Sequence, residues 1–196
     1  MWDELLATFR DIYDDPEDRA VVLTGAGGAF CSGADVRTMG SSVEERSALA
    51  AMRQVSDVAL ALHRLPQPVI AKVRGVAAGA GCNLALAADL VVASSSARFS
   101  EIFTRRGLSV DFGGTWILPR LIGLHKAKEL AFFADVITAH EADRIGILNK
   151  LVAHDELDDT VDEWANRLAA GPPLATAMTK RLLTLNASAD FAAAIE

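Results

Sequence analysis

Two stretches of the chain share one arrangement, a short run of branched apolar residues that leads into a turn rich in glycine. The first is VVLTG at 21–25, which continues to AFCSGAD at 29–35, and the second is VIAKV at 69–73, which continues to GVAAGAGCN at 75–83. Such runs, bounded by glycine, predict buried strands. Glycine also lets the chain turn tightly and lets a ligand approach the backbone. We therefore expect two buried strands that each deliver the chain into a turn of small residues.

The pattern around these stretches favours an α/β domain with a mainly parallel sheet, because short apolar strands alternate with helices. Apolar residues at helical spacing predict helices over 2–13, 43–65 and 82–88, and strands are predicted over 19–24, 69–73 and 89–93. Beyond Gly113 only 150–153 is expected to be extended. The helices predicted there are 114–121, 125–134, 139–146, 156–170 and 173–185.

Composition narrows the classes of function. A chain of 196 residues that is 51% apolar can bury one sizeable core, and a net charge of −7 argues against nucleic acid or an anionic membrane as partner. No apolar run is long enough to span a bilayer, and the acidic start lacks the features of a signal peptide. Cys31 and Cys82 do not suggest disulfides, and the scattered histidines do not suggest a metal site. We expect a cytoplasmic protein without a metal.

The two turns have two interpretations. Together, their backbone N–H groups could form an oxyanion hole, with a helix beginning after the second turn. Alternatively, the glycines only close tight loops and let a helix pack near the sheet. Neither turn fits a nucleotide-binding motif, because 25–30 lacks the Gly-Lys-Ser/Thr of a P-loop and 79–81 lacks the third glycine of the dinucleotide fingerprint.

A third segment, RRGLSVDFGGTWILPRLIG at 105–123, follows AFCSGAD and the run PVIAKVRGVAAGAGCNLALAADLVVA at 68–93. In this order and spacing, the three segments resemble the enoyl-CoA hydratase/isomerase (crotonase) family over nearly the whole chain. The resemblance implies a crotonase-type spiral of ββα units at 1–135, with the coenzyme A and acyl site, and a helical C-terminal region at 136–196 used for oligomerisation. It also implies an acyl-CoA substrate whose thioester carbonyl lies between the backbone N–H groups of Ala34 and Ala80.

The acid/base residues of the hydratases in this family are two glutamates, which fall on Asn83 and Phe103 here. Neither an amide nor a phenyl ring can transfer a proton at neutral pH. Asp111 is the expected replacement, since the resemblance to the ring-opening and double-bond isomerases of aromatic-acid degradation implies one acid there. The alternative for Asp111 is a cap on the helix that begins at 113 or 114. We expect Glu101 to be an exposed, solvated carboxylate.

The remaining site residues rest on the same resemblance. Arg37, Arg105 and Arg106 could contact coenzyme A phosphates or be solvated surface charges, and Cys31 is expected to be a small buried thiol rather than a nucleophile. The residues expected to contact the substrate are Ala29, Ser32, Gly33, Asp35, Gly79, Asn83, Phe103 and Gly114.

Three functions remain open. The first is an isomerase that shifts a double bond or opens a ring with Asp111; the second is an enoyl-CoA hydratase or another crotonase-type lyase, with its acid/base elsewhere, for example on Glu101. The third is a non-catalytic acyl-CoA binding protein. The resemblance also implies a homotrimer or a dimer of trimers, and no cofactor, because coenzyme A is part of the substrate. Relative to the family the chain is short at both ends.

Overall fold

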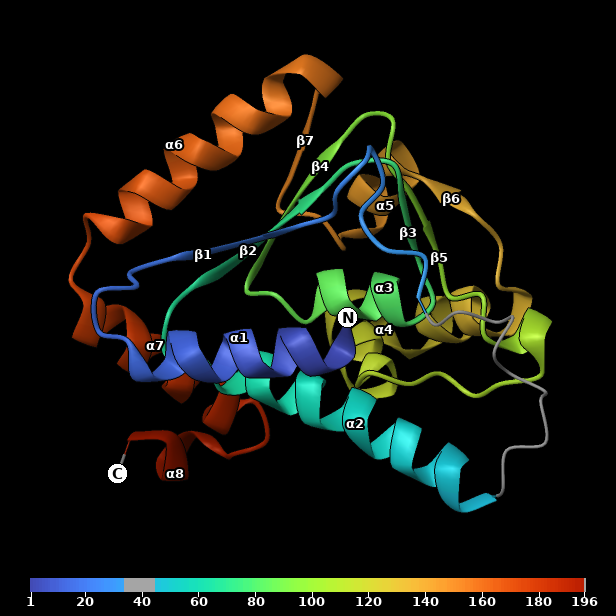
Figure 1. The fold of residues 1–196 in the computed structure, drawn as a ribbon, viewed down its shortest axis with the longest axis horizontal. Helices are drawn as coiled ribbons and strands as arrows, with labels where there is room; N and C mark the ends of the chain where they lie inside the picture. The colour runs from blue at the N-terminus through green and yellow to red at the C-terminus, as the bar shows by residue number, and fades with distance from the viewer. Residues whose placement is uncertain (34–44, 196) are drawn as a thin grey trace.

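The strands of the chain form two sheets. The backbone runs directly from a strand of the first sheet into a strand of the second, from β2 to β3 and from β4 to β5. The computed structural model describes residues 1–33 and 45–195. One sheet has the strand order β1-β2-β4-β7 and is parallel throughout; the other has the order β3-β5-β6, with β5 and β6 antiparallel (Figure 1). The strands are β1 Val21–Thr24, β2 Val69–Val73, β3 Val76–Ala78, β4 Leu90–Ser94, β5 Arg98–Ser100, β6 Ile137–Thr138 and β7 Lys150–Val152.

The chain passes from the first sheet to the second by sharp corners. Between β2 and β3 the corner is Gly75, whose φ is +62° and where an added Cβ would lie 2.2 Å from the carbonyl oxygen of Gly28. Between β4 and β5 the corner is formed by residues 95–97. Each pair of strands is followed by a helix, α3 after β3 and α4 after β5. The predicted α/β alternation is therefore confirmed, with the repeating unit strand, strand, helix.

The helices follow the apolar spacing of the sequence closely. They are α1 Trp2–Asp14, α2 Glu45–Arg64, α3 Ala80–Leu86, α4 Gly114–Phe133, α5 Ala139–Ile145, α6 Leu157–Ala169, α7 Pro173–Asn186 and α8 Phe191–Ile195, with short 3-10 turns at Thr104–Arg106 and His154–Glu156.

Four details differ from the expectation. The predicted helices at 114–121 and 125–134 form one element, α4, interrupted at Gly123, whose φ of 75° and ψ of 160° are not helical. Strand β3 at 76–78 was not predicted, because it lies within the glycine-containing segment 75–83 that was expected to follow the strand at 69–73 as a turn. Strands β5 and β6 were not predicted, since two or three residues are too few to show a period. Strand β6 interrupts the region after residue 135, which was expected to be helical apart from 150–153; β7 confirms the extended segment predicted there.

The central strand β2 is buried on both faces, which explains its unbroken apolar sequence. Val69, Ala71 and Val73 belong to the main core, which α1 and α2 cover from below in the view of Figure 1. Ile70 points the other way, into a smaller cluster beneath α6 that also contains Val92, Val152, Leu157 and Val161. One strand therefore holds helices on both faces of its sheet.

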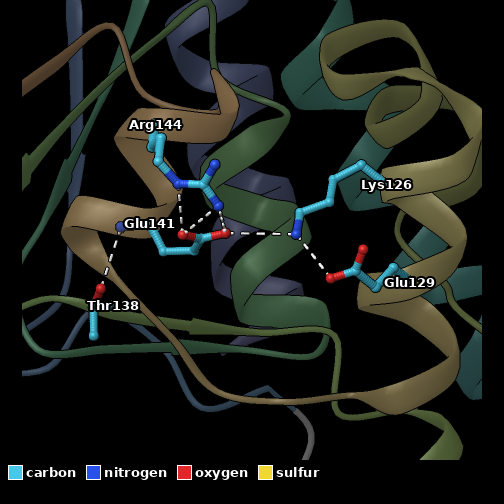
Figure 2. A network of polar contacts seen from close by, with 5 residues as sticks. All are labelled: Lys126, Glu129, Thr138, Glu141 and Arg144. Atoms are coloured by element: carbon cyan, nitrogen blue, oxygen red, sulfur yellow. Dashed lines mark hydrogen bonds and ion pairs between the residues drawn. The ribbon is translucent and has the colours of Figure 1, made fainter.

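Helices α4 and α5 are joined by an exposed polar network (Figure 2). Arg144 contacts Glu141 with an Nη2 to Oε1 distance of 2.6 Å, and Lys126 from α4 lies 3.5 Å from the same Glu141 oxygen and 2.8 Å from Glu129. Thr138 caps α5 by accepting a hydrogen bond of 3.2 Å from the Glu141 backbone N–H. Because these side chains are solvated, the network orients α5 more than it stabilises the fold.

The small cluster beneath α6 generates a stability prediction. Leu157 is fully buried, with 0% of its surface exposed, and Leu157→Ala should lower the free energy of unfolding by about 2–5 kcal/mol, because it leaves a cavity between α6 and the sheet. Urea unfolding followed by circular dichroism measures the change. Leu124→Ala on α4, where 55% of the residue is exposed, is the matched control and should change stability by less than about 0.5 kcal/mol. Equal losses in the two variants would contradict the assignment of this core.

Candidate active site

The two glycine-containing turns lie against each other. The Ala78 N–H donates to the carbonyl oxygen of Cys31 at 2.9 Å, and Cys31 pairs with Ala77 in an isolated parallel bridge. A Cβ added at Gly81 would lie 2.2 Å from the Cys31 oxygen, so no side chain fits there. A Cβ at Gly33 would lie 3.4 Å from the Ala80 nitrogen. These glycines do more than close their own loops, because they allow the two backbones to touch.

The backbone around Ala80 is set by its neighbours. Gly79 has a φ of +55° and donates its N–H to Ser100 at 2.9 Å, and the Asn83 N–H donates to the Gly79 oxygen at 3.1 Å. Within residues 1–33 and 45–195, no backbone acceptor is recorded for the N–H of Ala80, the first residue of α3. The other predicted donor, Ala34, and the predicted contact Asp35 lie outside the described residues, as does Arg37.

A buried polar cluster lies one helical turn beyond Ala80. The side-chain amide of Asn83, which is 0% exposed, donates from Nδ2 to Oε2 of Glu101 at 3.2 Å and to the backbone oxygen of Asp111 at 3.0 Å. Asn83 therefore links the segment after β5 to the segment before α4. Three buried oxygens of the cluster have no hydrogen-bond donor among the described residues, namely Asn83 Oδ1, Glu101 Oε1 and Asp111 Oδ1.

Burial shifts the ionisation of every titratable group in this cluster. Burial, and secondarily the nearby charge of Asp111, raises the pKa of Glu101 to about 7, although hydrogen bonds from Cys82 and Asn83 act in the opposite direction. Burial raises the pKa of Asp111 to about 6. Burial and the neighbouring Glu101 carboxyl raise the pKa of the Cys82 thiol well above its usual value. Both carboxyl groups therefore titrate close to neutral pH, where acid/base chemistry needs them.

The expectation that Glu101 is exposed and solvated is wrong. Only 3% of Glu101 is exposed, against 1% of Phe99 and 4% of Phe103. Ser100, between Phe99 and Glu101, is buried as well at 5%. The apolar residues that flank Glu101, Phe99 before it and Phe103 after it, were the signal that could have placed it inside. The signal was hidden because a lone carboxylate is rarely buried without a charged partner.

Asp111 is positioned by an unusual turn. Phe112 and Gly113, which follow it, both have left-handed backbones, with φ of 49° and 78°. The Phe112 ring is buried and packs against Trp2, with 5.7 Å between the ring centroids, which compensates for the strain of a left-handed non-glycine residue. The N-cap of α4 is Gly113, and no side chain caps it. The alternative of Asp111 as a helix cap is therefore wrong.

The other predicted contact residues surround this cluster. Phe103 is buried, and its ring lies 3.8 Å from a Cβ added at Gly79. Gly114 packs directly on the Asn83 amide, where an added Cβ would lie 2.4 Å from Nδ2. Ala29 and Ser32 are exposed beside the first turn.

The remaining candidate site residues lie outside the polar cluster or already have partners within the protein. Arg105 pairs with Asp135 and donates to the Phe133 backbone oxygen at 3.2 Å, so it has protein partners already. Cys31 is partly buried. In the part of the chain that the structure describes, no group of three or more His, Cys, Asp or Glu side chains could hold a metal ion.

Two grooves of the molecule lie away from the cluster. One, of about 940 Å³, lies between α1, α2 and α7, and the other, of about 750 Å³, lies between α4 and α7. Neither is lined by Asn83, Glu101 or Asp111. We place the candidate site on the polar cluster, because it alone among these places combines buried acids with backbone turns.

Comparison with known proteins agrees with this geometry. The family model described as Enoyl-CoA hydratase/isomerase matches residues 1–196. A Rhodobacter capsulatus protein named as a probable enoyl-CoA hydratase is 45% identical over 166 residues, which are 84% of this chain and 64% of that protein. The 1,2-epoxyphenylacetyl-CoA isomerase of Escherichia coli K12 is 35% identical over 191 residues, covering 92% of this chain and 70% of that protein. The chain thus spans about two thirds of the length of these relatives.

Solved structures give the same result for the fold. The crystal structure of the enoyl-CoA hydratase of Mycobacterium smegmatis matches with a TM-score of 0.94 and 34% identity, and covers 100% of this chain and 76% of that chain. The enoyl-CoA hydratase of Bacillus anthracis matches with a TM-score of 0.94 and 32% identity, and the match covers 99% of this chain and 75% of that chain. The predicted crotonase-type α/β fold is confirmed. With a family match over residues 1–196, the chain belongs to the enoyl-CoA hydratase/isomerase family.

Proposed function

We propose that the protein is an acyl-CoA isomerase in which Asp111 moves a proton between two carbons of a coenzyme A thioester. The observation that carries this proposal is the Asp111 carboxyl itself. It is held by a left-handed turn, its Oδ1 is buried and has no donor among the described residues, and burial raises its pKa to about 6. An acid with a pKa near the working pH can both take and return a proton.

The enolate would be stabilised by backbone N–H groups of the two turns. A thioester α-proton is weakly acidic, so its removal requires donors fixed where the negative charge arrives. The proposed donors are Ala80, whose N–H is next to Gly33, and Ala34. The close packing of Gly81 on Cys31 supports this role, since it holds the two turns together before any ligand binds.

The identity of the residues at the hydratase positions also supports isomerisation. Asn83 and Phe103 replace the two glutamates and cannot exchange protons at neutral pH. Asn83 instead binds Glu101 and the Asp111 backbone, and Phe103 lies beside Gly79. The similarity to the Escherichia coli 1,2-epoxyphenylacetyl-CoA isomerase agrees with this assignment. The substrate we propose is an unsaturated or ring-strained acyl-CoA, with no cofactor beyond the coenzyme A of the substrate.

Hydration is the second candidate, and one observation favours it. Glu101 is a second buried carboxyl with a pKa of about 7, and it shares Asn83 with the Asp111 segment. Two acids with raised pKa values in one site could together add water to a double bond. Relatives named as enoyl-CoA hydratases, such as that of Clostridium acetobutylicum at 38% identity, agree with this alternative.

We extend the proposal to the assembly and location of the protein. A homotrimer or a dimer of trimers, formed through the region 136–196, is supported by exposed apolar side chains there, such as Leu183 and Phe191, which are 72% and 81% exposed. The absence of a nucleic-acid partner is proposed from the net charge of −7. A cytoplasmic location is proposed because Cys31 and Cys82 are both free thiols. In the described ranges, no helix is sufficiently long and apolar to cross a bilayer.

The first prediction concerns Asp111→Asn. With a 3-enoyl-CoA in deuterated water, the wild-type protein should shift the double bond, and the variant should lose roughly 100- to 10,000-fold in rate because the amide cannot carry the proton. Nuclear magnetic resonance follows both migration and deuterium uptake. Asp135→Asn, which changes an exposed carboxylate paired with Arg105, is the matched control and should keep the wild-type rate.

The same assay separates the three functions. Hydration of a 2-enoyl-CoA without double-bond migration would favour the hydratase. Binding of the thioester without either reaction, in the wild type as in Asp111→Asn, would favour a binding protein. Wild-type migration rates in Asp111→Asn would rule out Asp111 as the acid/base.

A second prediction concerns the acidic side of the pH profile. The pKa of Asp111 is raised from its usual 3.8 to about 6, and the base form that starts the reaction is the ionised one. As pH rises through about 6, kcat/KM for the 3-enoyl-CoA should therefore rise, because the ionised fraction of Asp111 grows. An acidic limb centred near 4 instead would show that Asp111 titrates as an ordinary solvated carboxylate.

A further inference from the structure

Glu101 is a buried acid that the proposed proton transfer does not use. It follows β5 directly, is 3% exposed, and receives a hydrogen bond from Asn83 at 3.2 Å on Oε2. Its other oxygen, Oε1, is buried and has no donor in the described part of the chain. The Cys82 thiol also donates weakly to this carboxyl, but burial acts more strongly than either donor, so the environment suits the ionised form poorly.

The charges around Glu101 lead to the same conclusion. The titratable groups that act on it are Cys82 from α3 and Asp111 from the segment before α4, and neither is a cation. Across residues 1–33 and 45–195, no lysine, arginine or histidine forms an ion pair with Glu101 or Asp111. Glu101 is buried and Asp111 is partly buried, and the charge of Asp111 opposes the ionisation of Glu101, so without a cation the two carboxyl groups do not both ionise readily. One of them must keep its proton, and Glu101 is the more deeply buried.

A proton on Glu101 also improves the hydrogen bonding of the cluster. The oxygens without donors, on Asn83, Glu101 and Asp111, are all acceptors while both acids are ionised. Protonation converts Oε1 of Glu101 from an acceptor without a donor into a donor itself, which removes one unsatisfied buried acceptor from the cluster. Oε2 remains the acceptor for the Asn83 amide.

We propose that Glu101 is a positioning residue, held as a neutral carboxylic acid that donates a hydrogen bond within the Asn83–Asp111 cluster and so keeps Asp111 oriented and ionised for proton transfer. This proposal rests on the proposed role of Asp111 as the acid/base. Glu101 itself does not exchange protons with the substrate. Its ionisation at higher pH would put a second negative charge beside Asp111 and remove the hydrogen-bond donor.

The activity test compares Glu101→Gln with Glu101→Leu. The glutamine side chain keeps the size and a hydrogen-bond donor but cannot ionise, so Glu101→Gln should retain activity within about tenfold of wild type at acidic pH. If Glu101 transferred the proton itself, the same variant would lose activity by about 100-fold or more. Wild-type kcat should fall on the alkaline side as Glu101 ionises, and this fall should be absent in Glu101→Gln. Glu101→Leu, which lacks the hydrogen-bond donor, should have a lower kcat and an unchanged KM. A loss at every pH in Glu101→Gln, or an unchanged alkaline fall, overturns the proposal.

A second test needs neither substrate nor Asp111 chemistry. The pKa of Glu101 is raised from 4.5 to about 7 in the folded chain, so its contribution favours the fold fully below 4.5 and is lost as pH rises through 7. This corresponds to a change on the order of a hundredfold in the unfolding equilibrium. Urea unfolding of wild type should therefore weaken over this interval more than that of Glu101→Gln. Identical pH dependence in the two proteins would mean that Glu101 is ionised throughout, against the proposal.

A third measurement uses wild type alone, in case the variants fold poorly. In protein labelled with carbon-13 at glutamate side-chain carboxyls, one resonance should titrate near pH 7. Titration of all glutamates in their ordinary range would refute a neutral Glu101. If unfolding and carbon-13 data agree with the proposal while Asp111→Asn remains active, the proposed function fails and the neutral state of Glu101 stands.

Discussion

The contact between the two glycine-containing turns is the constraint on which the site depends. Gly81 lies on the carbonyl oxygen of Cys31 at a separation that no side chain would permit, and Gly33, whose φ is +87°, lies beside the Ala80 nitrogen. The hydrogen bond from Ala78 to Cys31 extends this contact into the second sheet. A backbone held from both sides cannot reorganise when a ligand arrives, and donors that need no reorganisation are those that stabilise developing charge best.

The fold brings this contact and the buried acids together through one repeated unit. In each repeat a strand of the first sheet turns a corner into the second sheet and then enters a helix, so that β3 leads into α3 and β5 leads toward α4. Asn83 on α3 therefore lies between Glu101, directly after β5, and Asp111, directly before α4. Its amide occupies the space that Gly114 leaves free. The polar cluster is the point where two successive repeats touch.

Within the family, the change of the two glutamate positions to Asn83 and Phe103 does not leave the site without acids. Carboxyl groups remain at Glu101, which is buried, and at Asp111, which is partly buried, and burial raises the pKa of both. A proton shift along the substrate needs one carboxylate that takes and returns a proton, the role proposed for Asp111. Water addition instead requires both carboxyl groups to act on one water molecule. This difference in demand is the physical basis for favouring isomerisation.

The sequence by itself determined the α/β class, the main helices and the long strands, because apolar residues at periods of 3.6 and 2 report burial directly. It also located the two glycine-containing turns, and it put forward Asp111 as the acid from the family resemblance, a role that stays a prediction. Tertiary structure alone decided that Glu101 is buried, that Asp111 does not cap α4, and that Asn83 joins the two acid-bearing segments. Each of these depends on contacts between residues 18 to 28 positions apart, as between Asn83 and Glu101 or Asp111, which no local pattern reports. Burial of a charge is a property of the assembled neighbours rather than of the residue.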